Sequence, residues 1–67
     1  MLVYKFDVLK ALIESGYSTH RLRKEKLLGE NNIQYLRENK IVGMKALNSI
    51  CKLLDMQPGD IIKYIEE

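Results

Sequence analysis

The sequence has very few of the residues that form disulfides and metal sites. Among its 67 residues are one cysteine, Cys51, and one histidine, His20. A single thiol cannot form an internal disulfide, and this pair falls short of the four ligands of a structural zinc site. No Cys–His, Ser–His or carboxylate pair has a spacing that would converge in a cleft. We therefore expect a protein that is not an enzyme, that holds no metal or cofactor, and that is stabilised by hydrophobic burial.

Long apolar runs are also absent. None approaches the roughly 18 residues needed to cross a membrane. The opening segment MLVYKFDVLK lacks the basic start and the cleavage site of a secretory signal. Hydrophobic residues make up 46% of the chain and charged residues 30%, which is typical of compact soluble domains. The length allows one small domain, residues 1–67, and we expect it in the cytoplasm, with no membrane and no small-molecule ligand as partner.

The net charge of +2 is small, but the basic residues are unevenly distributed. Four of them fall within six positions: Arg21, Arg23, Lys24 and Lys26. Such a cluster suits a polyanionic partner. Taken alone, it is better explained as an ordinary solvated surface, and it gains weight only from the residues around it.

Hydrophobic periodicity and capping residues predict an all-α fold of four helices and a shorter final element. In the first helix, Val8, Leu9, Leu12 and Ile13 form one apolar stripe, and Gly16 ends it. In the last full helix, Cys51 continues the apolar spacing and is interpreted as a small core residue. Pro58 suits the first turn of the final element, after which Ile61 and Ile62 are expected to close the core. The expected helices are 7–15, 18–26, 30–39 and 44–54.

The two ends of the chain, LVYKF and IIKYIEE, are rich in residues that favour β-strands. Val3, Tyr4 and Phe6 are expected to pair with Tyr64 and Ile65 in a small two-stranded ladder that joins the termini. The alternative is that both ends are frayed coil. An isolated strand pair is marginal in water, so the ladder needs the helices or a second subunit beside it.

Side-chain amides are concentrated in the helix expected at 30–39. Ile33 and Leu36 define its buried side, and the opposite side carries Asn31, Gln34, Tyr35 and Glu38. An amide both donates and accepts hydrogen bonds, which matches the paired donor and acceptor on the edge of adenine. A helix that needs only solubility gains more from Lys and Glu. This pattern indicates a recognition face.

The helix at 18–26, the turn LLG, the helix at 30–39 and the segment ALNSICKLLDMQPGDIIKYI together resemble the phage-repressor type of helix-turn-helix domain, the Cro/XRE class. The likeness is closest to short bacterial members that end in C-x-x-L-x-x-Q-P-G-D-I, which is found here at 51–61. It covers nearly the whole chain. The resemblance implies a compact lambda-repressor-like bundle of four to five short helices, with the helix-turn-helix at about 18–39. It also implies a transcriptional regulator, a repressor, that binds double-stranded DNA sequence-specifically.

In the repressor pattern, the helix at 30–39 enters the major groove and the helix at 18–26 lies across the DNA backbone. The base-reading positions that the resemblance implies are Glu30, Asn31, Asn32 and Tyr35. The positions assigned to the DNA backbone are Ser18, Thr19, Arg23, Gln34, Arg37 and Lys40, of which we expect Arg37 and Lys40 in the loop after the reading helix. Lys24, Lys26 and Lys45 are expected to add long-range attraction only.

Each base-reading residue also has a structural explanation. Asn31 and Asn32 could satisfy free backbone groups at the start of their helix. Glu30 suits the first turn of a helix because of the helix dipole, or it could accept from a cytosine amino group or reject misplaced phosphates. Tyr35 could cover the surface against Tyr17 or Arg21, or contact the groove or a phosphate.

The turn before the reading helix departs from the family pattern. Leu27 stands where glycine is usual, and Gly29 where many relatives have Ser or Thr. Either Leu27 is left-handed, at a cost of about 1 kcal/mol, or the turn is rearranged around Gly29. The two possibilities orient the reading helix differently.

One domain of this size offers few DNA contacts, and related repressors bind as symmetric dimers to half-sites about 34 Å apart. We expect a homodimer formed through the terminal segments. The alternative function is a protein-interaction module on a repressor-like fold, such as an antitoxin or antirepressor partner. The polar face of Asn31, Asn32 and Tyr35 argues against it, since protein-binding faces carry more apolar anchors.

Overall fold

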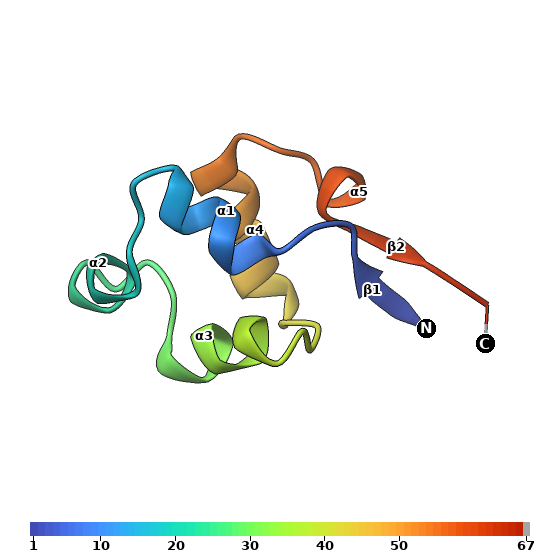
Figure 1. Ribbon diagram of the computed structural model, residues 1–67, viewed down its shortest axis with the longest axis horizontal. Helices are drawn as coiled ribbons and strands as arrows, with labels where there is room; N and C mark the ends of the chain where they lie inside the picture. The colour runs from blue at the N-terminus through green and yellow to red at the C-terminus, as the bar shows by residue number, and fades with distance from the viewer. Residues whose placement is uncertain (67) are drawn as a thin grey trace.

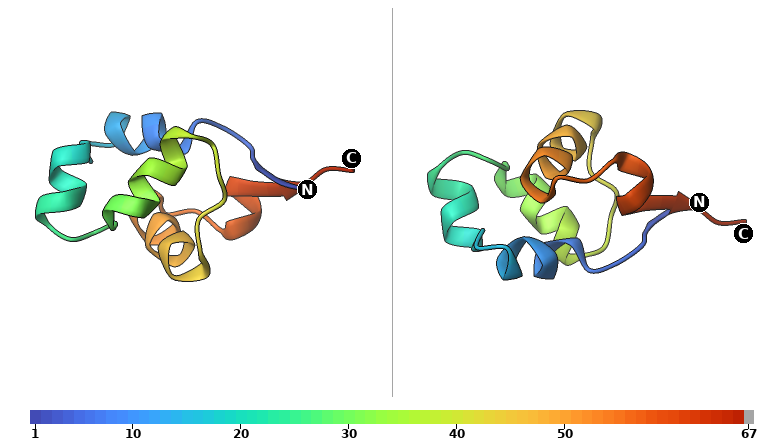
Figure 2. Two further views of the ribbon diagram at one scale, coloured as in Figure 1. Left: turned by 90° about the horizontal axis from the view of Figure 1, so that it is seen from below. Right: turned by 90° about the horizontal axis from the view of Figure 1, so that it is seen from above.

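The chain folds as a bundle of short helices with a two-stranded ladder at one end (Figure 1). The computed structural model describes residues 1–66, and its principal extents are 37 × 22 × 20 Å. The elements in chain order are β1 (Leu2–Tyr4), α1 (Val8–Glu14), α2 (Thr19–Lys24), α3 (Glu30–Arg37), α4 (Met44–Leu54), α5 (Pro58–Ile61) and β2 (Ile62–Tyr64). The ladder and α2 lie at opposite ends of the long axis, with α1, α3 and α4 between them (Figures 1 and 2). None of the helices in residues 1–66 has the length and apolarity of a membrane span.

The predicted helix starts are confirmed. Asp7 caps α1 by accepting a hydrogen bond from the Lys10 amide at 3.1 Å, and Ser18 caps α2 by accepting from the Arg21 amide at 3.2 Å. These side chains satisfy amides that have no partner inside the helix. The helices expected at 18–26 and 30–39 are shorter, because each expected range includes the capping residues at its end.

Four successive helices end in the same way. At the ends of α1, α2, α3 and α4, one residue has a positive φ: Gly16 at 97°, Lys26 at 54°, Asn39 at 57° and Asp55 at 54°. The next amide then bonds back to the helix, as in Leu27 N–H to the Leu22 carbonyl at 2.9 Å and Lys40 N–H to the Tyr35 carbonyl at 2.8 Å. This is the Schellman motif, which satisfies the last carbonyls and reverses the chain.

Neither expectation for the turn before α3 was correct. Lys26 is the left-handed residue, whereas Gly29 has a φ of −71° and is the N-cap of α3. Leu27 follows the left-handed residue, and its half-buried side chain packs against the core. The change in chain direction therefore occurs at the end of α2, and the apolar residues Leu27 and Leu28 that follow pack the turn against the core.

The core is formed by one residue set drawn from all five helices and the turns. Its largest fully buried side chains are Leu12, Leu22, Ile33, Ile50 and Ile61. Cys51 is half-buried against this set, in agreement with its interpretation as a packing residue. Burial of the set is the main favourable term in folding. Ile13 departs from the expected stripe, since 48% of its surface is exposed.

The terminal ladder is present. It is antiparallel, with Leu2 opposite Tyr64, Val3 opposite Lys63 and Tyr4 opposite Ile62. The partners expected for Val3 and Tyr4 were therefore wrong, and Ile65 lies just beyond the end of β2. Phe6 does not belong to the ladder, contrary to expectation, because the chain bends after Lys5 donates to the Ile61 carbonyl at 2.8 Å. Phe6 packs against the core instead, together with Tyr4 and Ile62. The inner half of the ladder thus rests on the bundle.

Candidate nucleic-acid interface

The central element of the candidate interface is α3. Ile33 is fully buried and Leu36 is 3% exposed, so these two residues fix which side of the helix faces solvent. Asn31, Gln34 and Tyr35 lie on the exposed side, and 43% of Tyr35 is accessible. An eight-residue helix is about 12 Å long, which suits insertion of its first turns into a major groove.

Asn32 lies on the flank of α3 that faces α4 rather than at its outermost line. Its side chain is half-buried, and it borders a groove with Lys45 and Ser49 of α4. Gly29 supplies no capping side chain. A Cβ at position 29 would lie 3.8 Å from the side-chain amide nitrogen of Asn32. Of the two asparagines, Asn31 has the more open position.

Two of the predicted DNA-binding residues contact each other. The Nε of Arg23, in α2, donates to a carboxylate oxygen of Glu30 at 2.6 Å. The pair spans the turn and joins the two helices of the motif. Both side chains are substantially exposed, so the pair adds little to stability. Its effect is to reduce the positive field at the start of α3.

A second acidic residue gathers polar groups at the end of α3. Glu38 accepts from the Gln34 amide at 2.7 Å, and Lys40 lies 3.1 Å from its other oxygen. The hydrogen bond from Gln34 and the neighbouring charge of Lys40 lower the pKa of Glu38. Gln34 and Lys40 are therefore oriented by one carboxylate. Arg37 is the last residue of α3, not part of the loop as expected, and has no ion pair within residues 1–66.

Within the basic cluster around α2, Arg21 has a structural role. The Arg21 guanidinium donates to Glu25 at 2.6 Å and to the Gly16 carbonyl at 3.2 Å, and lies 4.8 Å from the Tyr17 ring centroid. The hydrogen bond and charge of Glu25 raise the pKa of Arg21. Arg21 thus holds α2 to the preceding turn.

Two hydroxyl side chains lie at the start of α2. The Ser18 oxygen accepts the capping hydrogen bond, which leaves the hydroxyl proton of Ser18 to donate, and Thr19 follows at the first helical position.

Tyr4 has a role that the sequence did not reveal. Its hydroxyl donates to the Lys40 carbonyl at 2.7 Å and accepts from the Val42 amide at 3.1 Å. Burial raises the pKa of Tyr4, and the Val42 hydrogen bond opposes this effect. The ladder is thereby tied to the loop after α3. The only signal in the sequence is a tyrosine at a strand position that faces the core.

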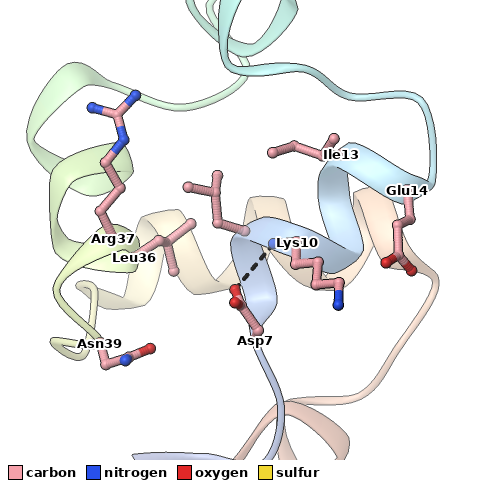
Figure 3. A pocket seen from close by; sticks show the side chains of 8 residues that line it. Asp7, Lys10, Ile13, Glu14, Leu36, Arg37 and Asn39 are labelled. Carbon is pink, nitrogen blue, oxygen red and sulfur yellow. Dashed lines mark hydrogen bonds between the residues drawn. The ribbon is translucent and has the colours of Figure 1, made fainter.

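An apolar groove lies between α1 and the end of α3. Leu9, Ile13 and Leu36 form its floor, and Lys10, Glu14 and Arg37 lie around it (Figure 3). Its volume is about 560 Å³. In Figure 3, Arg37 and Lys10 come from opposite walls, on α3 and α1. The exposed face of Ile13 borders this groove.

Two short helices at a sharp turn, with the second presenting polar side chains to solvent, define a helix-turn-helix domain. The model of one protein family, the Cro/C1-type HTH DNA-binding domain, matches residues 8–67. The chain belongs to this family. Neither the comparison with curated proteins nor that with solved structures gives a match.

Proposed function

We propose that the protein is a sequence-specific transcriptional repressor that reads the major groove of its operator with α3. Membership of a DNA-binding family supports the DNA-binding part of this proposal. The observation that carries the reading mode is the orientation of α3. Ile33 and Leu36 hold it to the core, so that neutral amide and hydroxyl groups point outward.

The proposed base-reading set is Glu30, Asn31, Asn32 and Tyr35. Asn31 and Tyr35 have the most direct access, since they lie one turn apart on the exposed side. Asn31 is suited to a bidentate contact with adenine. Glu30 can accept from a cytosine amino group while Arg23 balances its charge. Asn32 reaches bases at the side of the groove nearest α4.

The proposed phosphate contacts surround α3. Ser18 and Thr19 contribute small hydroxyls at the start of α2, and Arg23, about one turn further along α2, contributes a guanidinium. Gln34, Arg37 and Lys40 contribute donors along α3 and the following loop. These contacts set the position of the domain on the duplex, and the bases then supply the sequence preference.

The ion pairs on this surface favour specific over nonspecific binding. Glu30 and Glu38 lie within or beside the reading helix and are paired with Arg23 and Lys40. A duplex in the wrong register leaves these carboxylates near phosphates, which is repulsive. The result is weak attraction to arbitrary DNA and a larger ratio between operator and random sequence.

A single domain makes too few contacts for tight operator binding, so we propose a homodimer that joins through the terminal segments and binds half-sites about 34 Å apart. Leu2, Tyr64 and Ile65 expose apolar surface there. Sedimentation at concentrations up to several hundred micromolar, with and without operator DNA, tests the dimer. A species that stays monomeric in both conditions would contradict it.

Selection of bound sequences from a random duplex pool tests the DNA-binding function. We expect one enriched motif, arranged as an inverted repeat, when the selection is run at low salt and repeated near 150 mM. Phosphate attraction is strongest at low salt, so a pool that shows no enrichment there would overturn the proposal.

The groove between α1 and α3 supports a second candidate, a protein-interaction module. Its apolar floor of Leu9, Ile13 and Leu36 could receive an apolar side chain of a partner, as interface anchors do. Selection of bound DNA sequences with the wild-type chain and with Ile13→Glu separates the two functions. A DNA-reading protein keeps its enriched motif with this substitution, whereas an interaction module has no motif to keep.

A further inference from the structure

The outer edge of β1 is open. In an antiparallel pair, residues alternate between positions that exchange hydrogen bonds with the partner strand and positions whose backbone groups point outward. Met1 bonds Ile65, and Lys5 bonds Ile61, so the same alternation assigns Val3 to the bonded set. The backbone N–H and C=O groups of Leu2 and Tyr4 then point away from β2. Within residues 1–66, no further segment hydrogen-bonds to them.

We propose that β1 pairs with the β1 of a second copy, in antiparallel orientation, to form a four-stranded sheet with the order β2-β1-β1-β2. This inference deepens the homodimer of the proposed function and rests on it. An exposed strand edge is a template for another strand, and a two-stranded ladder becomes more stable when it is extended. A groove of about 490 Å³ lies beside β1 and is lined in part by Met1, Val3, Lys5 and Asn39.

The hydrogen-bonding pattern selects the register. Only a two-fold axis through Val3 lets both outward-facing residues of one strand meet both of the other, with Leu2 opposite Tyr4 of the second copy. This register forms four backbone hydrogen bonds. Val3 then faces Val3 of the second copy at a non-hydrogen-bonded position, where side chains approach most closely.

Charge selects β1 over β2. The equivalent symmetric pairing through the outer edge of β2 would place Lys63 opposite Lys63 of the second copy. Like charges directly opposite each other destabilise a strand pair. The β1 pairing instead places uncharged Val3 at the axis, and its like charges lie beyond the strand ends, where the Met1 terminus is opposite Lys5 of the second copy. The second copy of this chain is therefore a better occupant of the β1 edge than of the β2 edge.

The apolar residues at the tip of the ladder support the same assembly. Leu2 is 48% exposed and Tyr64 is 68% exposed, and they face each other across the ladder on the side that carries Tyr4 and Ile62. Tyr4 and Ile62 are covered by the bundle, whereas Leu2 and Tyr64 extend beyond it. In the proposed sheet, the tip of each ladder lies beside the inner half of the other, so these side chains fill the space between the two bundles.

Cysteine cross-linking tests the pairing. In a Cys51→Ala background, Val3→Cys places two thiols across the proposed axis at Cα separations near 4.5 Å, within the range that a disulfide accepts. Lys63→Cys is the matched control, because it lies in the same ladder pair and is the more exposed of the two. We expect Val3→Cys to form covalent dimers at least about tenfold faster than Lys63→Cys under mild oxidation, since pairing raises the effective thiol concentration.

The outcomes separate this inference from the proposed function. Cross-linking of Lys63→Cys as fast as Val3→Cys overturns the β1 pairing, and so does a dimer in sedimentation that neither variant cross-links. Circular dichroism of both variants checks that the helices are intact, and a second variant, Val3→Lys, tests the pairing by sedimentation if the cysteine variant does not fold. Val3→Lys places like charges opposite each other at the axis, so the dimer is expected to weaken, and an unchanged dimer overturns the pairing. DNA selection on the wild-type chain is an independent test. An enriched motif without β1 cross-linking overturns only the β1 pairing. Cross-linking without an enriched motif overturns only the DNA-binding function.

Discussion

Arg23 and Glu30 form an ion pair across the turn of the helix-turn-helix, with 2.6 Å between the Arg23 Nε and a Glu30 carboxylate oxygen. We expect Glu30→Gln to strengthen nonspecific DNA binding, because the Glu30 charge no longer offsets that of Arg23 near the phosphates. The slope of log affinity against log salt concentration should increase in magnitude by about 1. Fluorescence anisotropy over a salt series measures both. Glu14→Gln is the control, since it removes the same charge from α1. Equal effects of the two substitutions would show that only net charge matters.

Asn31 is the residue most open to a base edge. We expect Asn31→Ala to reduce operator affinity by about 1 to 3 kcal/mol and to relax the sequence preference at one position of each half-site. Nonspecific affinity should change little, because no phosphate contact is lost. Asn48→Ala, on the exposed side of α4, is the matched control. A uniform loss of affinity across all sequences would assign Asn31 to the backbone instead.

Lys26 has a left-handed conformation that favours glycine. A residue with a Cβ lowers the free energy of unfolding by about 1 to 2 kcal/mol in this conformation. Glycine avoids that strain, but its larger conformational entropy in the unfolded chain lowers the free energy of unfolding by about 0.5 to 1 kcal/mol. We therefore expect Lys26→Gly to stabilise the fold by about 0.5 kcal/mol in urea unfolding. Leu27→Gly should destabilise it by about 2 kcal/mol, because it removes a half-buried side chain. The reverse order would place the bend at Leu27.

The Tyr4 hydroxyl joins β1 to the loop that carries Lys40. We expect Tyr4→Phe to lower the free energy of unfolding by about 1 to 2 kcal/mol, since the part-buried Val42 amide loses its acceptor. Hydrogen exchange at the Val42 amide should accelerate. Tyr64→Phe, at a largely exposed tyrosine, is the control and should be close to neutral.

The contribution of the Tyr4 hydroxyl to stability depends on pH. Burial raises the pKa of Tyr4, so the folded state favours the neutral phenol. Its contribution to stability is complete below the ordinary tyrosine pKa of about 10, and it is lost as the pH rises through the higher folded value. Ultraviolet titration should show one tyrosine ionising later than the others, and this late step should vanish in Tyr4→Phe.

Much of the fold could be predicted because its signals are local. Asp7, Ser18 and Gly16 mark helix ends through side chains or backbone freedom that act within a few residues, and Ile33 and Leu36 mark the buried side of α3 through spacing alone. The family resemblance was confirmed over residues 8–67. The turn was missed because a lysine occupies the left-handed position, where sequence rules look for glycine.

The details of the candidate site depend on contacts between distant segments, and spacing within one helix does not contain them. The pairing of Arg23 with Glu30 follows from how α2 meets α3, and the bond from Tyr4 to Lys40 joins residues 36 positions apart. Phe6 leaves the ladder because the bundle offers it an apolar site. In each case tertiary packing, which the local sequence does not encode, decides the partner.

The terminal ladder joins residues as far as 64 positions apart in the chain, as in the contact between Met1 and Ile65. Closing so long a loop costs chain entropy before any strand contact compensates for it, whereas the helices need only near neighbours. The ladder is thus expected to form last during folding and to open first in the native protein. Amides of the ladder should exchange with solvent sooner than those of α4, and their protection should rise with protein concentration if a second copy holds the strands in place.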